Sequence, residues 1–245
     1  MKQFLILGGT GDVGSGVIAA LLDAGHSVLA TSRGGPKAEA LRNRHAGRSF
    51  HLIEGSVHDE AAAATLLQGV RARVDRVDGV LAGLSGARPQ GKTLVEWSSA
   101  DLLAIVHANL ITHFVAAKTF VPIVVDGGIY IGLGGAMADR IFPHYSYNSM
   151  IQSAQRTMFR YLDHELENHR IAIRELIIGA MVTTEDKAKG DDPKYNWITD
   201  REVSEHIRAM LENPADFPGP IEHLFSARGV GRSRPVDPAS VRAVA

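Results

Sequence analysis

The sequence lacks cysteine altogether, and this absence excludes a disulfide framework, thiol catalysis and metal sites built on thiolates. An excess of charge is missing as well, because 26 basic and 27 acidic side chains leave a formal net charge of −1. A chain without a basic excess has no electrostatic footprint for nucleic acid, so we expect no such partner. Of the 245 residues, 45% are hydrophobic, which is ample for a sizeable core.

Long apolar runs are also absent. The amino-terminal run 4–7 ends at glycines and is too short for the core of a signal peptide. A membrane-spanning helix needs roughly 18 apolar residues, and Lys118 and Pro122 interrupt the best candidate. The sequence therefore predicts a protein of the cytoplasm that makes no contact with membranes.

What the sequence does contain is a regular alternation of short apolar runs with segments of helical spacing. The predicted strands are 4–7, 27–31, 50–54, 79–83, 128–133 and 171–178, with a candidate final strand at 222–227. The predicted helices are 13–24, 36–44, 60–69, 102–120, 145–168 and 200–211. Such alternation indicates an α/β fold with a doubly wound parallel sheet and helices on both of its faces. No repeat or linker divides the chain, so we expect a single domain over residues 1–245, with substrate loops near 85–98 and 184–196.

A glycine-rich turn lies between the first predicted strand and the first predicted helix, in residues 8–14. Glycine suits such a turn because it adopts positive φ and because a Cβ would block the approach of a pyrophosphate to the backbone. The start of the helix then offers free N–H groups and a partial positive charge. We therefore predict a dinucleotide site of the Rossmann type rather than an ordinary glycine-rich turn. Its expected cofactor contacts in this turn are Gly8, Thr10, Gly11, Asp12, Val13 and Gly14.

The end of the second predicted strand bears on which nucleotide would bind. An acidic residue there would accept hydrogen bonds from the adenosine ribose and would repel a 2′-phosphate. This sequence has Ser32 and Arg33 instead, and a guanidinium group suits a phosphate. We therefore expect NADP, in its reduced form NADPH, in preference to NAD. A surface arginine without a ligand is the alternative interpretation of Arg33.

From Lys2 to Leu211 the pattern resembles the short-chain dehydrogenase/reductase family. The glycine turn has the GxxGxxG spacing of the extended and atypical branches of that family. The resemblance implies an active-site asparagine at Asn109, in the long helix 102–120. It also implies further cofactor contacts from Val57, Gly83, Gly179 and Thr183. Two neighbours depart from the family pattern, since Ser56 stands in place of an aspartate and Ile178 in place of a proline.

The catalytic centre departs further from the family pattern. The family uses a tyrosine, a lysine four residues later, and a serine just after the fifth strand. The resemblance places the tyrosine at Tyr145, but Ser149 then holds the lysine position. Residues 131–135, where the serine would fall, contain none. Two of the three chemical groups of the centre are therefore missing.

These losses change the chemistry that we expect. Carbonyl reduction needs a hydride donor, a proton donor and a group that holds the developing alkoxide. Without a neighbouring ammonium group, Tyr145 should stay protonated at neutral pH, so it can give a proton but cannot readily accept one. This favours reduction over alcohol oxidation. A substrate with its own acidic hydroxyl, such as a phenolic or polyketide-like ketone, could supply the proton, and His144, Tyr147 and Asn148 are alternative donors.

Two further interpretations concern metals and oligomers. His164 and His169 superficially suggest a zinc site, but they are five residues apart and lie about 140° apart around a helix, so we expect no metal. The helices 102–120 and 145–168 carry apolar residues on more than one face. Members of the resembling family usually associate through these two helices. We therefore expect a homodimer or a homotetramer.

The sequence thus predicts an NADPH-dependent reductase of a small-molecule carbonyl compound, with Tyr145 as the proton donor and Asn109 as an organising residue. Two alternatives come from other classes. A dinucleotide-binding redox sensor or scaffold without turnover is favoured by the missing lysine and serine. A sugar-nucleotide epimerase or dehydratase shares the glycine spacing, but the chain length and Arg33 argue against it.

Overall fold

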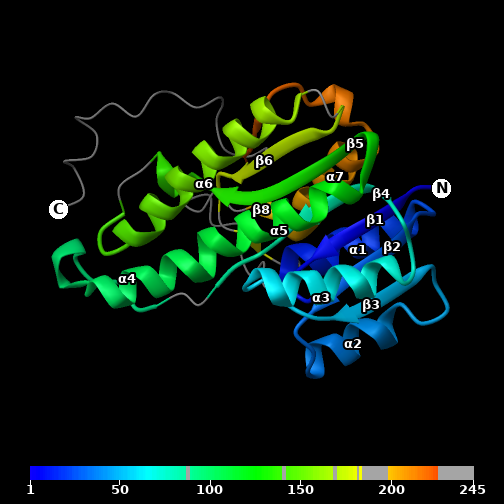
Figure 1. Cartoon of the computed structure of the whole chain (residues 1–245), viewed down its shortest axis with the longest axis horizontal. Helices are drawn as coiled ribbons and strands as arrows, with labels where there is room; N and C mark the ends of the chain where they lie inside the picture. The colour runs from blue at the N-terminus through cyan, green and yellow to red at the C-terminus, as the bar shows by residue number, and fades with distance from the viewer. Residues whose placement is uncertain (87–88, 140–141, 168–169, 181, 184–197, 226–245) are drawn as a thin grey trace.

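The computed structural model describes residues 1–86, 89–139, 142–167, 170–180, 182–183 and 198–225, and strands alternate with helices through most of them (Figure 1). The elements in chain order are β1 (Gln3–Leu7), α1 (Asp12–Asp23), β2 (Ser27–Ser32), α2 (Pro36–Arg44), β3 (Phe50–Glu54), α3 (Glu60–Arg71), β4 (Val77–Ala82), α4 (Ser99–Val106), α5 (Thr112–Phe120), β5 (Val124–Gly135), α6 (Ser146–Glu165), β6 (Ala172–Ile178), β7 (Val182–Thr183), β8 (Ile198–Thr199), α7 (Asp200–Glu212) and β9 (Ile221–Leu224).

One seven-stranded sheet, in the order β3-β2-β1-β4-β5-β6-β9, organises these elements. All of its neighbouring strands are parallel. The order reverses beside β1, since β2 lies on one side of it and β4 on the other. In sheets of this kind, ligands bind outside the carboxyl ends of the strands at such a switch point. The predicted doubly wound α/β fold is confirmed.

Helices cover both faces of the sheet and divide the core into two layers. In β1, Phe4 and Ile6 pack with α1 and α7, whereas Leu5 and Leu7 pack with α3, α5 and α6. All four side chains are fully buried. A central strand of a parallel sheet must bury both faces, which is why its sequence is continuously apolar rather than alternating.

The long predicted helix 102–120 is interrupted in the structure. It begins earlier, as α4, because the Ser98 hydroxyl caps it by accepting a hydrogen bond of 3.0 Å from the Asp101 N–H. A π-helical turn, η2 (His107–Ile111), then joins α4 to α5. Such turns are rare and often lie at functional sites. The sequence pattern does not distinguish this turn from an ordinary helix.

This helical stretch also bears on the expected absence of membrane contact. Ser99–Ile123 is long and apolar enough to cross a membrane by length and composition, and 28% of its most apolar window is buried. Lys118 and Pro122, which lie within this stretch, therefore do not exclude it as a candidate. The observation is weak evidence for a membrane span, because core helices of soluble proteins meet the same criterion. On α5 the side chains of Val115 and Phe120 are fully buried in the core.

Other boundaries also differ from the prediction. β5 runs from Val124 to Gly135, longer at both ends than 128–133, and α6 begins at Ser146 with Tyr145 as its N-cap residue. β7 and β8 form a separate two-stranded parallel sheet that the sequence did not predict. The predicted loop 184–196 and the end of the predicted strand 222–227 lie outside the described residues.

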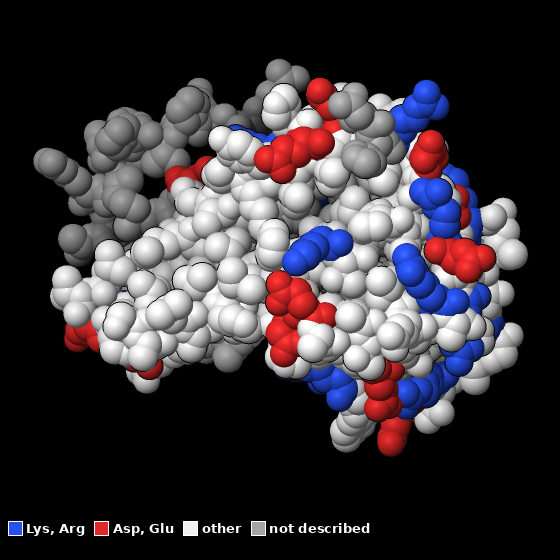
Figure 2. Space-filling view, viewed as in Figure 1, with Lys and Arg blue, Asp and Glu red and all other residues white. Residues whose placement is uncertain are grey.

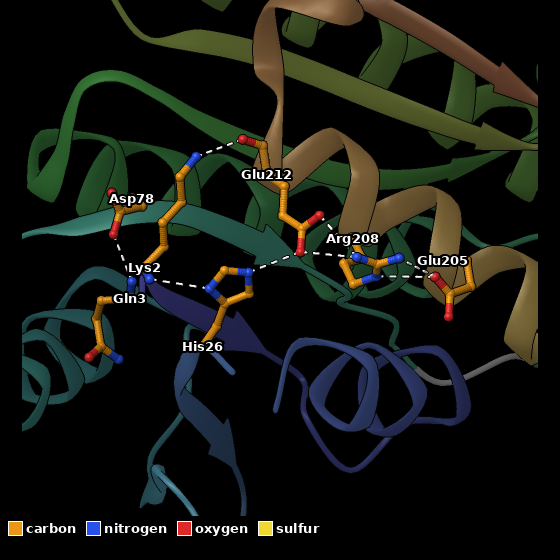
Figure 3. A network of polar contacts seen from close by, with 7 residues as sticks. All are labelled: Lys2, Gln3, His26, Asp78, Glu205, Arg208 and Glu212. Carbon is orange, nitrogen blue, oxygen red and sulfur yellow. Dashed lines mark hydrogen bonds and ion pairs between the residues drawn. The ribbon is translucent and has the colours of Figure 1, made fainter. Parts of the chain in front are cut away.

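A polar network fastens the amino-terminal edge of the sheet, far from the carboxyl ends of the strands (Figure 3). The Lys2 ammonium donates a hydrogen bond of 2.6 Å to the Glu212 carbonyl at the end of α7. The Glu212 carboxylate lies 2.9 Å from His26 Nε2 and 3.0 Å from Arg208. Burial raises the pKa of Glu212, but hydrogen bonds from His26 and Arg208 together lower it by more, so the net shift is downward. The network thus joins the ends of β1, α1 and α7.

We expect Glu212→Gln to lower the free energy of unfolding by about 1–2 kcal/mol at pH 7, because it removes the charge that faces two partners. The matched control is Glu205→Gln, since Glu205 binds the same Arg208 but is about half exposed. An exposed pair contributes little, so the control should cost less than about 0.5 kcal/mol. Urea unfolding followed by circular dichroism measures both. Equal effects of the two substitutions would contradict the role given to the network.

Candidate active site

The glycine turn lies at the carboxyl end of β1, where it closes tightly on its neighbours. Gly8 has a φ of +83°, and a side chain there would overlap the Gly83 carbonyl at the end of β4. A Cβ on Gly14 would lie 2.5 Å from the Gly8 oxygen. The Gly9 N–H donates a hydrogen bond of 2.9 Å to the Thr31 carbonyl of β2. The turn is therefore fixed between three strands, and only glycine fits at positions 8 and 14.

The start of α1 remains open beside this turn. Gly11 is the N-cap residue, no side chain caps the helix, and Asp12 in its first turn is exposed. The nearest atom to a Cβ on Gly11 would be the Gly8 oxygen, 3.5 Å away. Uncapped N–H groups and an unobstructed approach are the features that a pyrophosphate requires. The residues at this turn therefore fit a dinucleotide.

Side chains of both charge signs lie around the end of β2: Arg33 follows β2 itself, and Glu54 ends the neighbouring strand β3. Ser32 is buried and its hydroxyl accepts a hydrogen bond of 3.1 Å from the Gly34 N–H, whereas Arg33 is exposed. A Cβ on Gly34 would lie 3.1 Å from a carboxylate oxygen of Glu54, at the end of β3. Glu54 is itself paired with Arg42 at 2.6 Å. The sequence did not predict that an acid from the neighbouring strand would stand beside this loop.

The next strand ends in the segment that includes Val57. Val57 is only 6% exposed and belongs to the core beneath α3, which leaves it little surface for a nucleotide. Asp59 caps α3 by accepting a hydrogen bond of 2.8 Å from the Ala62 N–H, and this bond lowers the pKa of Asp59. Asp59 therefore acts as the N-cap of α3.

Asn109 joins two parts of the predicted site. It lies in the π-helical turn η2, and its Oδ1 accepts a hydrogen bond of 2.9 Å from the Gly86 N–H. Its Nδ2 donates one of 3.0 Å to the Ile105 carbonyl. Gly86 belongs to the loop that follows β4 and Gly83, so Asn109 holds the start of the predicted substrate loop 85–98 against the helix.

A second side chain of this helix, which the sequence analysis missed, holds the same loop. His113 is buried and lies 3.2 Å from the Leu84 carbonyl through Nε2. Burial lowers the pKa of His113 to about 4. A neutral imidazole that donates to a carbonyl is a structural group at pH 7 rather than an acid. The sequence offered one indication of this role: His113 follows Asn109 by four residues, so the two side chains share one face of the helix.

Tyr145 stands where the loop 85–98 meets the start of α6. Its side chain is 43% exposed. His144 before it has a φ of +67°, a left-handed conformation that non-glycine residues rarely adopt, and a Cβ on Gly91 would lie 2.7 Å from the His144 carbonyl. Tyr147 is buried and its hydroxyl donates to the Pro89 carbonyl at 3.4 Å. The structure thus brings Tyr145 together with the loop that Asn109 holds.

The end of β5 carries no hydroxyl, and the side chains of α6 lie against its backbone. The side-chain Oε1 of Gln152 accepts a hydrogen bond of 2.9 Å from the Met137 N–H, and Asn148 Nδ2 lies 2.8 Å from the Met137 sulfur. Ser149, at the position of the family's lysine, is partly buried. Asn148 is thus engaged with the segment before Tyr145.

The remaining predicted contacts lie after β6. A side chain on Gly179 would overlap the Phe225 ring, and the Gly179 N–H donates to the Leu224 carbonyl at 2.9 Å. Thr183 is 6% exposed and pairs with Thr199 in the small sheet of β7 and β8. Gly179 is therefore required by packing, and the predicted cofactor contacts of both residues remain predictions.

Metal ligands do not gather in the described residues: no group of three or more His, Asp or Glu side chains there could hold an ion. His164 lies 4.0 Å from Glu167, while His169 lies outside the described residues.

The family assignment follows from a direct match. A family profile described as enoyl-(acyl carrier protein) reductase matches residues 11–210. The strand order and the glycine turn define an α/β protein of the kind that binds NAD(P). The chain belongs to the short-chain dehydrogenase/reductase family of oxidoreductases.

Solved structures show the same fold at low sequence identity. A double mutant of a Serratia marcescens short-chain dehydrogenase/reductase is 21% identical, with a TM-score of 0.80 over 94% of this chain and 98% of that one. An alcohol dehydrogenase from the archaeon Thermococcus sibiricus, complexed with 5-hydroxy-NADP, is 22% identical, with a TM-score of 0.76 over 95% and 100%. A dehydrogenase/reductase from Sinorhizobium meliloti 1021 is 18% identical, with a TM-score of 0.78 over 94% and 95%. A comparison with curated proteins finds no match.

Proposed function

We propose that this protein is an NADPH-dependent reductase of carbonyl compounds that works without the family's lysine and serine. The observation that carries the proposal is the uncapped start of α1 behind a turn in which positions 8 and 14 admit only glycine, at the switch point of the sheet. When bound, NADPH supplies the hydride. The backbone of residues 8–14 would hold its pyrophosphate.

The preference for NADPH over NADH rests on the charges at the end of β2. Arg33 is exposed, and in the part of the chain that the structure describes no ion pair joins it to an acid, whereas Arg42 is bound to Glu54 at 2.6 Å. A 2′-phosphate beside Gly34 would therefore meet two guanidinium groups and one carboxylate. The net positive charge supports NADPH, although Glu54 reduces the advantage.

The proton in this proposal comes from Tyr145. Its phenol is partly exposed beside the loop 85–98, and no ammonium group follows it at Ser149. Tyr145 would hold its proton until charge develops on the substrate oxygen, which favours reduction. Because a serine is missing from the end of β5, a ketone with a neighbouring phenolic hydroxyl would supply part of the lost stabilisation itself.

The direct test mixes the purified protein with NADPH and a panel of ketones that includes phenolic ones, and follows the loss of NADPH absorbance. We expect consumption, and Tyr145→Phe should lower kcat by about 100-fold or more, because the general acid is lost. Tyr147→Phe should have at least a tenfold smaller effect, since that hydroxyl already donates to Pro89. If Tyr147→Phe lowered kcat more than Tyr145→Phe, Tyr147 rather than Tyr145 would be the proton donor.

A second candidate function is a nucleotide-binding redox sensor without turnover. The specific observation in its favour is that neither Ser149 nor the glycines at the end of β5 can replace the missing groups. Binding of NADPH by calorimetry, together with no consumption across the whole panel, would favour the sensor. Consumption of any ketone would exclude it.

We propose further that the protein forms a homodimer through the face made by α4, α5 and α6. In Figure 2 few charged side chains lie at the left of the view, where Figure 1 labels α4, whereas charges gather towards the right, where Figure 1 labels α2 and α3. Large apolar side chains are exposed on these helices, among them Leu103 at 69%, Phe114 at 42%, Met150 at 47% and Tyr161 at 60%. Large apolar side chains left exposed on three helices favour an interface here. A second copy of the chain would cover these apolar side chains. We also propose that the protein is located in the cytoplasm.

Light scattering after size-exclusion chromatography tests the dimer. The wild type should have twice the chain mass of 26.3 kDa. The double substitution Leu103→Glu and Phe114→Glu should shift it to the monomer, because burying two new charges opposes association. Ala64→Glu, which adds one such charge on the exposed side of α3, is the control for the substitution chemistry. A monomeric wild type would contradict the proposal.

A further inference from the structure

A cavity opens at the amino-terminal edge of the sheet, away from the glycine turn. Its volume is about 370 Å³, and it lies between the starts of the first strands and the turn that follows α3. That volume is in the range of sites for small molecules. The buried side chains of Val28 and Leu29 line part of it. Polar residues line the rest, namely Gln3, Ser27, Ser49, His51 and Arg73.

The strands present these polar side chains on the face that α3 covers. Gln3 and Ser27 begin β1 and β2 and are partners in the parallel register. Side chains alternate between the two faces of a strand, so Gln3 lies on the same face as Leu5. By the same rule, Ser27 lies on the same face as Leu29. Leu5 and Leu29 both pack in the core layer that contains α3. His51 is the register partner of Leu29 and therefore shares this face.

The neutral polar groups of the cavity have donors to spare. The Gln3 backbone N–H donates a hydrogen bond of 2.7 Å to Asp78, but the Gln3 side chain points away from that network (Figure 3). Within the described residues, no hydrogen bond engages the Gln3 amide or the hydroxyls of Ser27 and Ser49. The described lining also contains no carboxylate that would compete for these donors.

Arg73 supplies the positive charge of the cavity. Its backbone is fixed, because its N–H donates a hydrogen bond of 2.9 Å to the Val70 carbonyl in the last turn of α3. One guanidinium nitrogen lies 3.4 Å from His51 Nδ1. A guanidinium can only donate, so the ring nitrogen accepts, and His51 orients Arg73 without neutralising it. In the described part of the chain no ion pair joins Arg73 to an acid, whereas Arg48 is bound to Asp23 at 2.7 Å.

We infer that this cavity binds the phosphate group of a small phosphorylated molecule, at a site separate from the nucleotide turn. The planar guanidinium of Arg73 can donate to two phosphate oxygens at once. The hydroxyls of Ser27 and Ser49 offer further donors. A phosphate has more acceptor oxygens than a carboxylate, so this set of donors favours phosphate. The inference goes beyond the reductase function and does not rest on it, because the cavity and the glycine turn lie at opposite edges of the sheet.

Calorimetric titration of the full chain with inorganic phosphate at pH 7 tests the site. We expect saturable binding, and Arg73→Gln should raise the Kd at least tenfold, because hydrogen bonds from a charged group are lost. The matched control is Arg71→Gln, which removes the same charge at the end of α3 but outside the cavity lining. Its Kd should stay within about twofold of the wild-type value, since salt screens a distant charge.

Three results of this titration would overturn the inference. One is the absence of saturable binding at millimolar phosphate. Another is an equal effect of Arg71→Gln and Arg73→Gln, which would mean that the phosphate responds only to the general surface charge. The third is malonate binding as tightly as phosphate, which would contradict the choice of a phosphate over a carboxylate.

The glycine turn is the other place where a phosphate would bind, and nuclear magnetic resonance of the wild type distinguishes the two. Phosphate should shift the backbone amide signals of His51 and Arg73 and leave those of residues 11–14 unchanged. Gly11→Ala should keep the wild-type Kd for phosphate. Shifts confined to residues 11–14, together with loss of binding in Gly11→Ala, would overturn the inference. None of these measurements uses turnover, so a failure of the reductase function would leave their outcome unaffected.

Discussion

Replacement of Gly14 by alanine is expected to destabilise the protein and to abolish nucleotide binding together. In an exposed helix, alanine in place of glycine stabilises by about 1 kcal/mol. Here the new Cβ would lie 2.5 Å from the Gly8 oxygen and 3.1 Å from the Gly9 Cα, and neither backbone atom can move without displacing β1. The steric effect reverses the sign, and we expect a net loss of about 3 kcal/mol.

Gly11→Ala separates binding from folding at the same turn. The φ of −75° and ψ of 161° at Gly11 suit alanine, and the nearest atom to its Cβ would be 3.5 Å away. The loss of stability should stay below about 1 kcal/mol. The methyl group would nevertheless occupy the approach of the pyrophosphate, so the Kd for NADPH should rise about tenfold or more, at 1.4 kcal/mol for each factor of ten.

Urea unfolding and calorimetric titration with NADPH measure these effects on the two variants and the wild type. Wild-type affinity in Gly11→Ala would show that the nucleotide does not approach this turn. Wild-type stability in Gly14→Ala would show that the turn can make room for a side chain at position 14, contrary to the close contact between residues 8 and 14.

The stability of Glu175→Gln relative to the wild type should grow with pH. The pKa of Glu175 is raised by burial from 4.5 to about 7. A group with a raised folded-state pKa contributes stability below its unfolded-state pKa and loses it as pH rises towards the folded-state value. The window is thus pH 4.5 to 7, and a shift of about 2.5 units corresponds to about 3 kcal/mol. Glutamine does not titrate, so it loses nothing in this window.

We therefore expect similar unfolding free energies for the two proteins near pH 5 and an advantage of about 3 kcal/mol for Glu175→Gln at pH 8. Urea unfolding at each pH unit gives the difference, in which the titration of all other groups cancels. Glu205→Gln, which removes an exposed acid of α7, is the control for the substitution itself. A constant difference between Glu175→Gln and the wild type would mean that Glu175 is ionised throughout this range.

The strand and helix order was predictable because each element has a local pattern. The run Phe4–Leu7 is apolar at every position because helices cover both faces of this strand. The glycine turn follows the strand where the sequence predicts it. The π-helical turn at Asn109 was not predictable, because its residues have ordinary helical spacing, and the bond from the Gly86 N–H to Asn109 joins it to a loop that is distant in the sequence.

The candidate site was predictable only where the backbone itself is the functional group. Gly8, Gly11 and Gly14 stood out in the sequence because a tight turn restricts residue type locally, and their contact with a cofactor stays a prediction. Glu54 was not found beside the cofactor loop, because its approach to Gly34 depends on the pairing of β2 with β3.

Three features could be read from the sequence without the structure: the alternation of strands and helices, the position of the glycine turn, and the lack of a lysine at position 149 and of a serine within residues 131–135. These are properties of residue type and short-range spacing. Two further features arise only on folding: Glu175 fills the space of a side chain at Gly134, and Arg156 of α6 binds Asp139. Those relations join residues from different elements, and burial, which changes the ionisation of an acid, exists only once the sheet and α6 have packed together.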